Sequence, residues 1–216
     1  MAKSSEPFPP GELLEKFADM AERSRAPDGD RQGDGWGAGW LDAQERWQTL
    51  KSSRPVWTDG SIFNLIPKSR IFLFHARSSS FPSHKNVLAY NQPFVRDAFT
   101  FVFNGLLQGV NLPVPVAGDI GSQKIWALLS DLLGAHEPGP SLERLAGLLD
   151  KNSRRIQALN IGLCDQKNLY AFCRYENQAG YYHLQFYESS GLKMVCSAAL
   201  SGYDFRPLPL NEVILF

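Results

Sequence analysis

The sequence predicts an α+β fold in which antiparallel sheets pack together and helices lie outside them. Strand-like segments fill the first half of the chain, two amphipathic helical segments follow, and strand-like segments return in the last third. The strongest strand is Phe99–Gly105, where three phenylalanines alternate with Thr100 and Val102. This period of two is typical of a strand with one strongly apolar face.

Composition is consistent with one globular domain over residues 1–216. A chain of 216 residues that is 44% hydrophobic and 20% charged can bury a substantial core. The formal net charge is zero and no basic stripe is present, which argues against nucleic-acid binding. No apolar run is long enough to cross a bilayer, and the N-terminus lacks the apolar core of a signal peptide. We therefore expect a cytoplasmic protein with neither a membrane nor a nucleic-acid partner.

The three cysteines, Cys164, Cys173 and Cys196, lie in apolar, strand-like contexts. An odd number of such residues without metal-ligand spacing indicates buried, reduced thiols. The four histidines are scattered, and no pair has the spacing of metal ligands. We expect no metal and no cofactor.

The first half of the chain predicts one helix and several short strands. The helix opens at Pro9-Pro10 and ends before Pro27, with apolar residues at helical spacing and acids early, where the helix dipole favours them. The next elements are expected to be strands Trp36–Leu41 and Arg46–Leu50 joined by a turn at Asp42–Glu45, a helical segment Ile62–Ile66 and the strand Arg70–Arg77.

The second half predicts two helices followed by more strands. The Phe99 strand is expected to stop at Asn104-Gly105, and Ser122 and Ser141 are expected to cap the two helices. The later strands are Ala158–Cys164, Leu169–Tyr175, Tyr181–Tyr187, Leu192–Ser197 and Val213–Phe216, with turns at Asp165–Asn168 and Ser189–Gly191.

Asn104-Gly105 has two interpretations. After alternating aromatics, Asn-Gly is the commonest signal of a tight hairpin, and this is the simpler interpretation. In the functional interpretation, the Asn amide and the Gly N–H converge on a developing oxyanion, as in acyl transfer. A glycine also lets a ligand approach the backbone closely.

Two other segments are candidates for the same pocket. Arg77 closes the second strong strand, where it is either an ion-pairing residue or a planar fork for a substrate carboxylate. His75 lies two residues earlier on the same face, although a lone strand histidine is usually a satisfied core residue. Asp34-Gly35-Trp36-Gly37 is either a turn that enters a strand or part of a pocket floor. We expect these segments and Asn104-Gly105 to form the walls of one pocket.

Four motifs in this order resemble the class II glutamine amidotransferases, most closely the stand-alone branch. They are Asp34-Gly35-Trp36-Gly37, His75-Ala76-Arg77, Pro93-Phe94 and Asn104-Gly105. The resemblance covers nearly the whole chain and ends in Arg206–Phe216. It implies the N-terminal-nucleophile hydrolase fold, a four-layer α-β-β-α sandwich of two antiparallel sheets with outer helices.

The resemblance also implies an activity and roles for residues. The family cleaves the γ-amide of glutamine or a related γ-glutamyl compound with an N-terminal cysteine whose own α-amine is the base. Asn104 and Gly105 would form the oxyanion hole, and Arg77 and Ser78 would bind the substrate. Pocket-lining positions would be Asp34, Gly35, Trp36 and His75. The partner is a small-molecule γ-glutamyl substrate, and a separate ammonia-accepting synthase is a possible second partner.

The sequence departs from the family pattern at the nucleophile. The family begins Met-Cys, whereas this chain starts inside the corresponding first strand, a few residues later, so that Ala2 follows Met1. Relatives carry an acid for the substrate α-amine at the position of Gly121, and Asp119 is the residue expected to replace it. Where many relatives carry His, this chain has Gln92 and Phe103.

These departures leave several functions open. One is an amidohydrolase whose N-terminal cysteine is missing from this numbered chain, with a γ-glutamyl conjugate hydrolase as a variant of the same mechanism. The other is a non-catalytic binding or scaffold protein that retained the fold. As numbered, the polypeptide is expected to be inactive, because none of its three cysteines is N-terminal.

Overall fold

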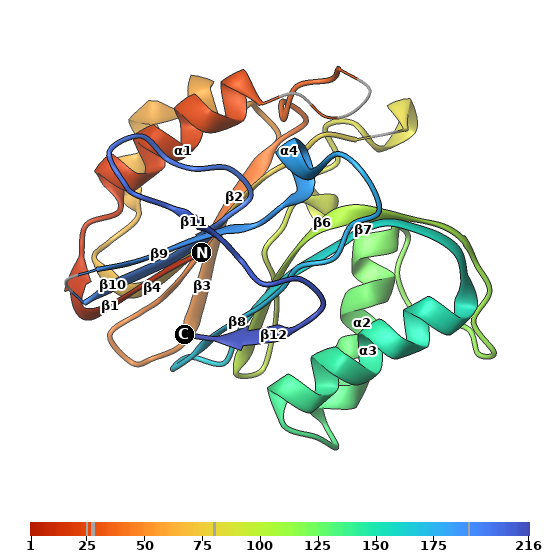
Figure 1. The fold of residues 1–216 in the computed structure, drawn as a ribbon. Coiled ribbons are helices and arrows are strands. Elements are labelled where there is room, and N and C mark those ends of the chain that lie inside the picture. The colour runs from red at the N-terminus through yellow and green to blue at the C-terminus, as the bar shows by residue number, and fades with distance from the viewer. Residues whose placement is uncertain (25, 27–28, 80, 190) are drawn as a thin grey trace.

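Two antiparallel sheets lie face to face, with helices outside both of them (Figure 1). The structure, a computed structural model, describes residues 1–24, 26, 29–79, 81–189 and 191–216. Helix α1 (Gly11–Arg23) covers the outer face of one sheet, and α2 (Gly121–Leu133) and α3 (Pro138–Asn152) cover the outer face of the other. The α+β class and the four-layer α-β-β-α order predicted from the sequence are confirmed.

The first sheet has seven strands, and the chain begins in its middle. Strand β1 pairs with β10 on one side and with β4 on the other. In spatial order the strands are β11 (Arg206–Pro207), β9 (Gln185–Ser189), β10 (Leu192–Cys196), β1 (Ala2–Phe8), β4 (Ser69–Ala76), β2 (Trp36–Leu41) and β3 (Trp47–Ser52). The N-terminus therefore begins an inner strand of this sheet (Figure 1).

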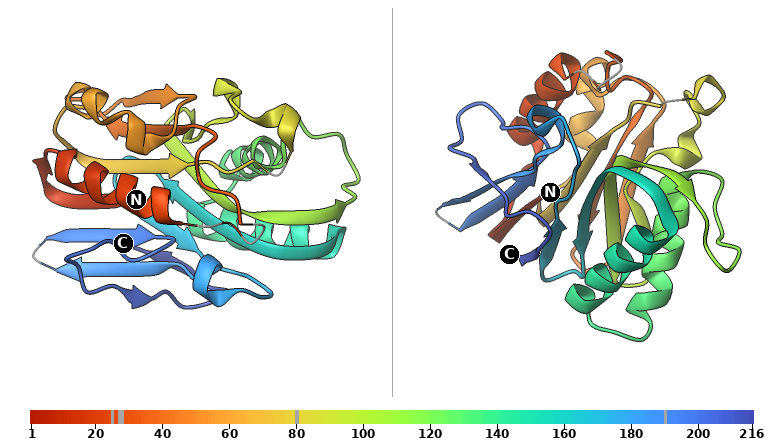
Figure 2. Two further views of the ribbon diagram at one scale, coloured as in Figure 1. Left: turned by 90° about the horizontal axis from the view of Figure 1, so that it is seen from above. Right: turned by 45° about the vertical axis from the view of Figure 1, so that its right-hand side comes forward.

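The second sheet has five strands and is dominated by the long β6–β7 pair. In spatial order its strands are β12 (Val213–Leu215), β8 (Leu169–Phe172), β7 (Ser153–Cys164), β6 (Phe99–Val110) and β5 (Phe94–Arg96). The short helical segments are η1 (Val56–Thr58), η2 (Gly60–Leu65), η3 (Pro82–His84), η4 (Leu88–Tyr90) and α4 (Ala179–Tyr182). Figure 2 shows the two sheets packed against each other from two further directions.

Strand alternation divides the core into layers. Phe101 and Phe103 of β6 are buried against α2 and α3, whereas Val102 faces the other sheet. Between the sheets, Ile71 and Leu73 of β4 pack in one cluster with Leu169, Ala171 and other residues of the opposite sheet. The alternating pattern at Phe99–Phe103 thus has the predicted cause, one face toward a helix layer.

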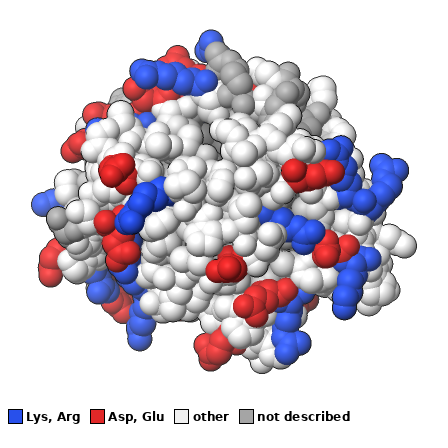
Figure 3. Space-filling view, viewed as in Figure 1, with Lys and Arg blue, Asp and Glu red and all other residues white. Residues whose placement is uncertain are grey.

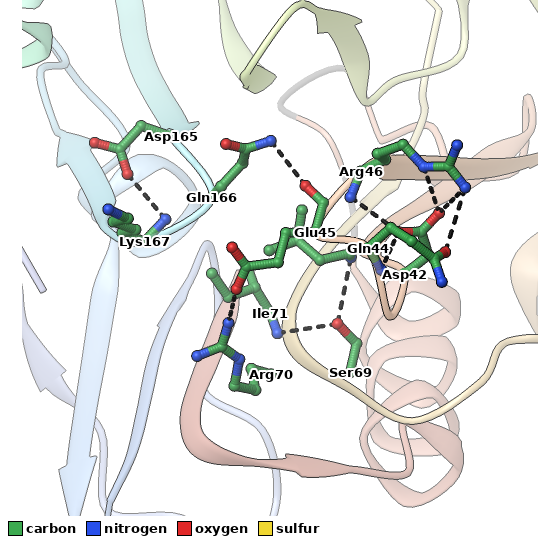
Figure 4. Close-up of polar contacts among 11 residues, drawn as sticks. Asp42, Gln44, Glu45, Arg46, Ser69, Arg70, Ile71, Asp165, Gln166 and Lys167 are labelled. Atoms are coloured by element: carbon green, nitrogen blue, oxygen red, sulfur yellow. Dashed lines mark hydrogen bonds and ion pairs between the residues drawn. The ribbon is translucent and has the colours of Figure 1, made fainter.

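The turn between β2 and β3 also ties the two sheets together (Figure 4). The Asp42 carboxylate accepts the Arg46 N–H at 2.9 Å, and Glu45 has a left-handed φ of 58°. The Glu45 carbonyl accepts a 2.8 Å hydrogen bond from Gln166 in the β7–β8 turn, while its carboxylate pairs with Arg70. The turn predicted at Asp42–Glu45 is confirmed, and its backbone links one sheet to the other.

The expectation that the Phe99 strand stops at Asn104-Gly105 is wrong. Strand β6 runs on to Val110, and Asn104 and Gly105 pair in register with Asn160 and Leu159 of β7. The hairpin interpretation fails because pairing with a strand far along the chain holds this dipeptide extended, against its local preference for a turn.

Several element boundaries also differ from the predictions. The segment expected as one strand at Tyr181–Tyr187 contains the end of α4 and the start of β9, and the strand from Leu169 ends at Phe172. The helical segment near Ile62 is a 3₁₀ helix. The turn expected at Ser189–Gly191 includes a residue outside the described ranges.

The two predicted caps are not the observed ones. Helix α2 begins at Gly121, so Ser122 is already its second residue. Helix α3 begins at Pro138, and the Ser141 hydroxyl instead donates to the carbonyl of His136 at 3.2 Å. Proline at the first helical position explains the earlier start of α3, because its missing N–H would have had no partner there anyway.

The surface in view carries interspersed charges of both signs (Figure 3). No helix in the described ranges combines the length and the apolar character needed to cross a membrane. In the same ranges, no group of three or more His, Cys, Asp or Glu side chains is placed to hold a metal ion.

Candidate functional site

A cleft of about 890 Å³ opens where the ends of β4, β6 and the loop before α2 meet. It brings together residues that are far apart in the sequence. The predicted site residues that line it are His75, Arg77, Ser78, Asn104, Gly105 and Asp119. The expectation that Arg77 and Asn104 face a common cavity agrees with this geometry.

A smaller cavity of about 100 Å³ surrounds the first residue of the chain. Met1, Cys196 and Asn160 line it, and His75 and Asn104 line both this cavity and the cleft. The Met1 amino group donates to the Val195 carbonyl at 2.7 Å, and burial lowers its pKa. Asn104 therefore lies between the start of β1 and the cleft.

The backbone N–H of Gly105 points to the free edge of β6. The Phe103 N–H donates to Gln92 Oε1 at 2.6 Å, so the backbone of Phe103 faces away from β7. In a strand, every second residue points its backbone N–H in the same direction. The N–H of Gly105, two residues after Phe103, therefore also faces away from β7. On β7, Leu159 lies opposite Gly105 and donates its N–H to the Arg174 carbonyl at 2.8 Å. The N–H of Leu159 thus points away from β6, as expected when Gly105 and Leu159 share no backbone hydrogen bond.

Only glycine fits at position 105. A Cβ there would lie 2.2 Å from the Ala158 carbonyl oxygen and 2.9 Å from the Phe103 ring. These distances are far below van der Waals contact, so any side chain would push β6 and β7 apart. Gly105 therefore permits the close approach of β6 and β7, and it also supplies the N–H at the edge of β6 that lines the cleft.

The Asn104 side chain lies on the face of β6 opposite to Phe103. Its neighbour in the same orientation, Val102, packs between the sheets. Asn104 is half-buried, and its amide makes no hydrogen bond to any residue that the structure describes. An amide donor is thus open to the cleft beside the N–H of Gly105.

Gln92 and His75 hold the peptide groups that precede Asn104. The Phe103 carbonyl accepts from Gln92 Nε2 at 3.1 Å and from His75 Nε2 at 3.2 Å. Because β5 pairs only with Phe99–Phe101 of β6, the Gln92 amide continues the strand pairing at Phe103. The Gln92 side chain is buried and therefore fixes the position of Asn104.

His75 is neutral at neutral pH. Burial, with smaller effects of nearby Arg77 and Lys51, lowers the pKa of His75 to about 4. Since Nε2 faces the Phe103 carbonyl, this geometry assigns the proton to Nε2. Nδ1 is buried without a hydrogen-bond partner in the described part of the chain.

The Arg77 guanidinium ties down the loop that follows β4. It donates to the His84 carbonyl at 2.7 Å and to Ser79 Oγ at 3.2 Å, and it lies 5.6 Å from the centre of the Tyr90 ring. Burial lowers the pKa of Arg77, whereas Asp34 acts in the opposite direction. The group stays charged, and within the described residues two of its five N–H donors have hydrogen-bond partners.

The structure does not place Asp34, Gly35 or Trp36 on the cleft surface. Trp36 is fully buried in a cluster with residues of α1 and η2, and its Nε1 donates to the Asp59 carboxylate at 3.0 Å. The Asp34 carboxylate accepts the Ser79 N–H at 2.7 Å. The Arg77 N–H donates to the Gly35 carbonyl at 2.9 Å. These residues support Arg77 and the loop that carries Ser78 from behind the cleft wall.

A hydrogen bond between a glutamine and a tyrosine joins the loop after α1 to α4. Gln32 Nε2, from the loop after α1, donates to the Tyr181 hydroxyl of α4 at 2.9 Å. Both residues line the cleft. Asn160 fixes the position of α4, since its amide donates to the Tyr182 carbonyl at 2.6 Å.

Sequence reasoning missed three contributors to this site. The sequence indicates Gln92 only as a departure from relatives that carry His, Asn160 as part of a strand, and Ser122 as a helix cap. Of these three residues, only Ser122 had a recognisable sequence signal, because it lies at the start of a helical segment. The roles of Gln92 and Asn160 depend on which backbone groups the fold brings to them.

Comparison with solved structures identifies the fold. A glutamine aminotransferase class-II domain protein from Silicibacter pomeroyi superimposes with a TM-score of 0.60 at 18% identity, over 84% of this chain and 86% of that chain. A predicted glutamine amidotransferase from Pseudomonas aeruginosa gives 0.55 at 16% identity, over 85% and 84% of the two chains.

A larger enzyme shares the same fold over part of its length. Glutamine phosphoribosylpyrophosphate amidotransferase from B. subtilis gives a TM-score of 0.68 at 12% identity, covering 99% of this chain and 46% of that one. No protein-family model and no curated protein sequence matches the chain. The chain has the N-terminal-nucleophile fold of the class II glutamine amidotransferases, which its four motifs predict.

Proposed function

We propose that this chain is the body of an amidohydrolase that cleaves glutamine or another γ-glutamyl amide, with residues 1–216 as a single domain. The observation that carries the proposal is the shared cleft. The Arg77 guanidinium, the Gly105 N–H and the Asn104 amide, which makes no hydrogen bond within the described residues, line one space beside the start of β1. These groups suit a carboxylate and a developing oxyanion.

The proposed roles are based on the chemical groups that each residue contributes to the cleft. Asn104 and Gly105 offer two hydrogen bonds to the oxygen of a tetrahedral intermediate. Arg77, with Ser78 beside it, binds the carboxylate at the other end of the substrate. His75 and Gln92 hold the backbone that carries the oxyanion donors.

The nucleophile in this proposal belongs to a segment that precedes Met1. Ala2 pairs with Phe72 of β4, and β4 continues through Ala76 with only β2 paired alongside its end. A continuation of β1 in the antiparallel direction would run past His75 toward Arg77. A cysteine a few residues upstream would thereby reach the cleft, with its terminal amine as base.

The experiment is to express the protein with the codons upstream of Met1 restored and to measure ammonia release from a panel of γ-glutamyl amides. We expect turnover that is lost when the upstream cysteine is replaced by Ala. Cys196→Ala is the matched control, because Cys196 lines the cavity but is not N-terminal, and it should retain activity. A folded, extended protein that binds these compounds without any turnover would contradict the proposal and support the non-catalytic alternative.

A further inference from the structure

The N-terminus of α2 forms an unoccupied anion-binding arrangement in the cleft. As the first residues of the 13-residue helix, Gly121 and Ser122 have backbone N–H groups without intrahelical acceptors. Ser122 is only 8% exposed and lines the cleft, and its hydroxyl makes no hydrogen bond to any residue in the described ranges. A buried, unpaired hydroxyl at the positive end of a helix favours an anionic ligand group.

The same helix end is connected to the Arg77 side chain through the segment Ala89-Tyr90. Gln123, in the first turn of α2, donates to the Ala89 carbonyl at 3.4 Å. The next residue, Tyr90, presents its ring to Arg77 at 5.6 Å. The segment Ala89-Tyr90 of η4 therefore contacts both anion-binding groups, and Arg77 and Ser122 line the same cleft.

The charges around this subsite oppose an ammonium group. Among the described residues that line the cleft, Arg77, Lys124 and Arg154 are cationic, and Asp119 supplies the only carboxylate. Asp119 is exposed at the rim, and its backbone N–H donates to Gln123 at 2.9 Å. Lys124 and Arg154 are exposed as well, so the buried charge in the described cleft wall is the Arg77 guanidinium, and no buried carboxylate among these residues is present to pair with an ammonium.

We infer that the substrate of this site is an acidic amide without a free α-ammonium, its α-nitrogen either absent or acylated. The inference rests on the proposed amide hydrolysis for the reaction, and on the α2 N-terminus and Arg77 for the ligand class. The substrate carboxylate binds Arg77 and the Ser122 hydroxyl. Glutaramate and N-acetylglutamine represent this class, and glutamine represents the zwitterionic alternative.

Position 121 offers a direct test, because a Cβ there meets no atom within 4 Å and its φ is outside the left-handed range. Gly121→Asp adds a carboxylate to the helix N-terminus, where an acid is favourable for stability. Gly121→Asn is the neutral control of the same shape. The probes are glutarate, N-acetylglutamate and glutamate, titrated calorimetrically into the 216-residue chain and both variants.

We expect glutarate and N-acetylglutamate to bind roughly ten- to a hundredfold more tightly than glutamate, as one charged hydrogen-bonding partner implies. Gly121→Asp should reverse this order, Gly121→Asn should preserve it, and Ser122→Ala should weaken binding of both ammonium-free acids. Glutamate binding as tightly as glutarate, or no binding of either ammonium-free acid, would overturn the inference.

Turnover by the extended protein separates this inference from the proposed function. Higher kcat/KM for glutamine than for glutaramate and N-acetylglutamine would refute the ligand class and leave the amidohydrolase standing. The stated binding order without turnover of any amide would refute the amidohydrolase and leave the ligand class standing.

Discussion

Replacing Gln92 tests whether one side chain holds the strand that carries Asn104. Gln92 is 4% exposed and makes two hydrogen bonds with the Phe103 backbone, one as acceptor at 2.6 Å and one as donor at 3.1 Å. In Gln92→Leu, the Phe103 carbonyl keeps His75 as a donor, but its N–H loses its acceptor. The change therefore leaves a buried backbone donor unpaired.

An unpaired buried donor costs about 1–3 kcal/mol, and the lost carbonyl bond adds about 1 kcal/mol. We expect Gln92→Leu to lower the free energy of unfolding by about 2–4 kcal/mol in urea denaturation. The Phe103 amide should also exchange faster with solvent deuterium. Gln92→His can restore only one of the two bonds and should lie between the wild type and Gln92→Leu.

Gln44→Leu is the control, because this glutamine is exposed on the β2–β3 turn. Its effect on stability should stay within about 0.5 kcal/mol, as for most surface substitutions. If Gln92→Leu changed stability no more than Gln44→Leu and left Phe103 exchange unaltered, the proposed support of β6 by Gln92 would be refuted.

Three further predictions concern the strand contact, the buried histidine and the thiols. Gly105→Ala should destabilise the fold by more than about 1 kcal/mol in urea denaturation, because its Cβ would lie 2.2 Å from the Ala158 carbonyl oxygen; an unchanged midpoint would contradict this packing. The pKa of His75 is lowered from 6.5 to about 4, so the unfolded chain binds more protons in that window and stability should fall as pH drops from 6.5 to 4. His75→Gln should flatten this pH dependence of the denaturation midpoint, and an equally steep dependence in the variant would show that other groups cause it. At pH 8 a thiol reagent should modify half-buried Cys196 before Cys164, whose pKa burial raises to about 12, and mass spectrometry showing the reverse order would contradict the burial pattern.

The sequence was sufficient for the fold where a pattern and its tertiary environment agree. The alternating phenylalanines of β6 face a helix layer, and Trp36–Leu41 is a strand with the predicted bounds. The sequence pattern led to a wrong prediction where a long-range contact outweighs a local conformational preference. Asn104-Gly105 is a strong turn signal, yet pairing with β7 keeps it extended, and no local pattern contains that information.

The candidate site could be predicted only in part for a related reason. Arg77 and Asn104 were identified by residue type and motif, and the topology brings both to one cleft. Trp36 was expected there but is buried, since its large ring packs in a core cluster with residues of α1 and with Phe63 of η2. Gln92 supports the site through hydrogen bonds to the Phe103 backbone. The residue type alone does not reveal which backbone groups the fold brings next to it.

The central claim is that Arg77 and the Asn104–Gly105 pair act on one substrate at the start of β1. Steady-state kinetics of the extended protein on its preferred γ-glutamyl amide tests this most directly. The account predicts that Asn104→Ala lowers kcat about 10²- to 10³-fold with little change in KM, and that Arg77→Gln mainly raises KM. Equal, small effects of both substitutions on an enzyme that still releases ammonia would contradict it.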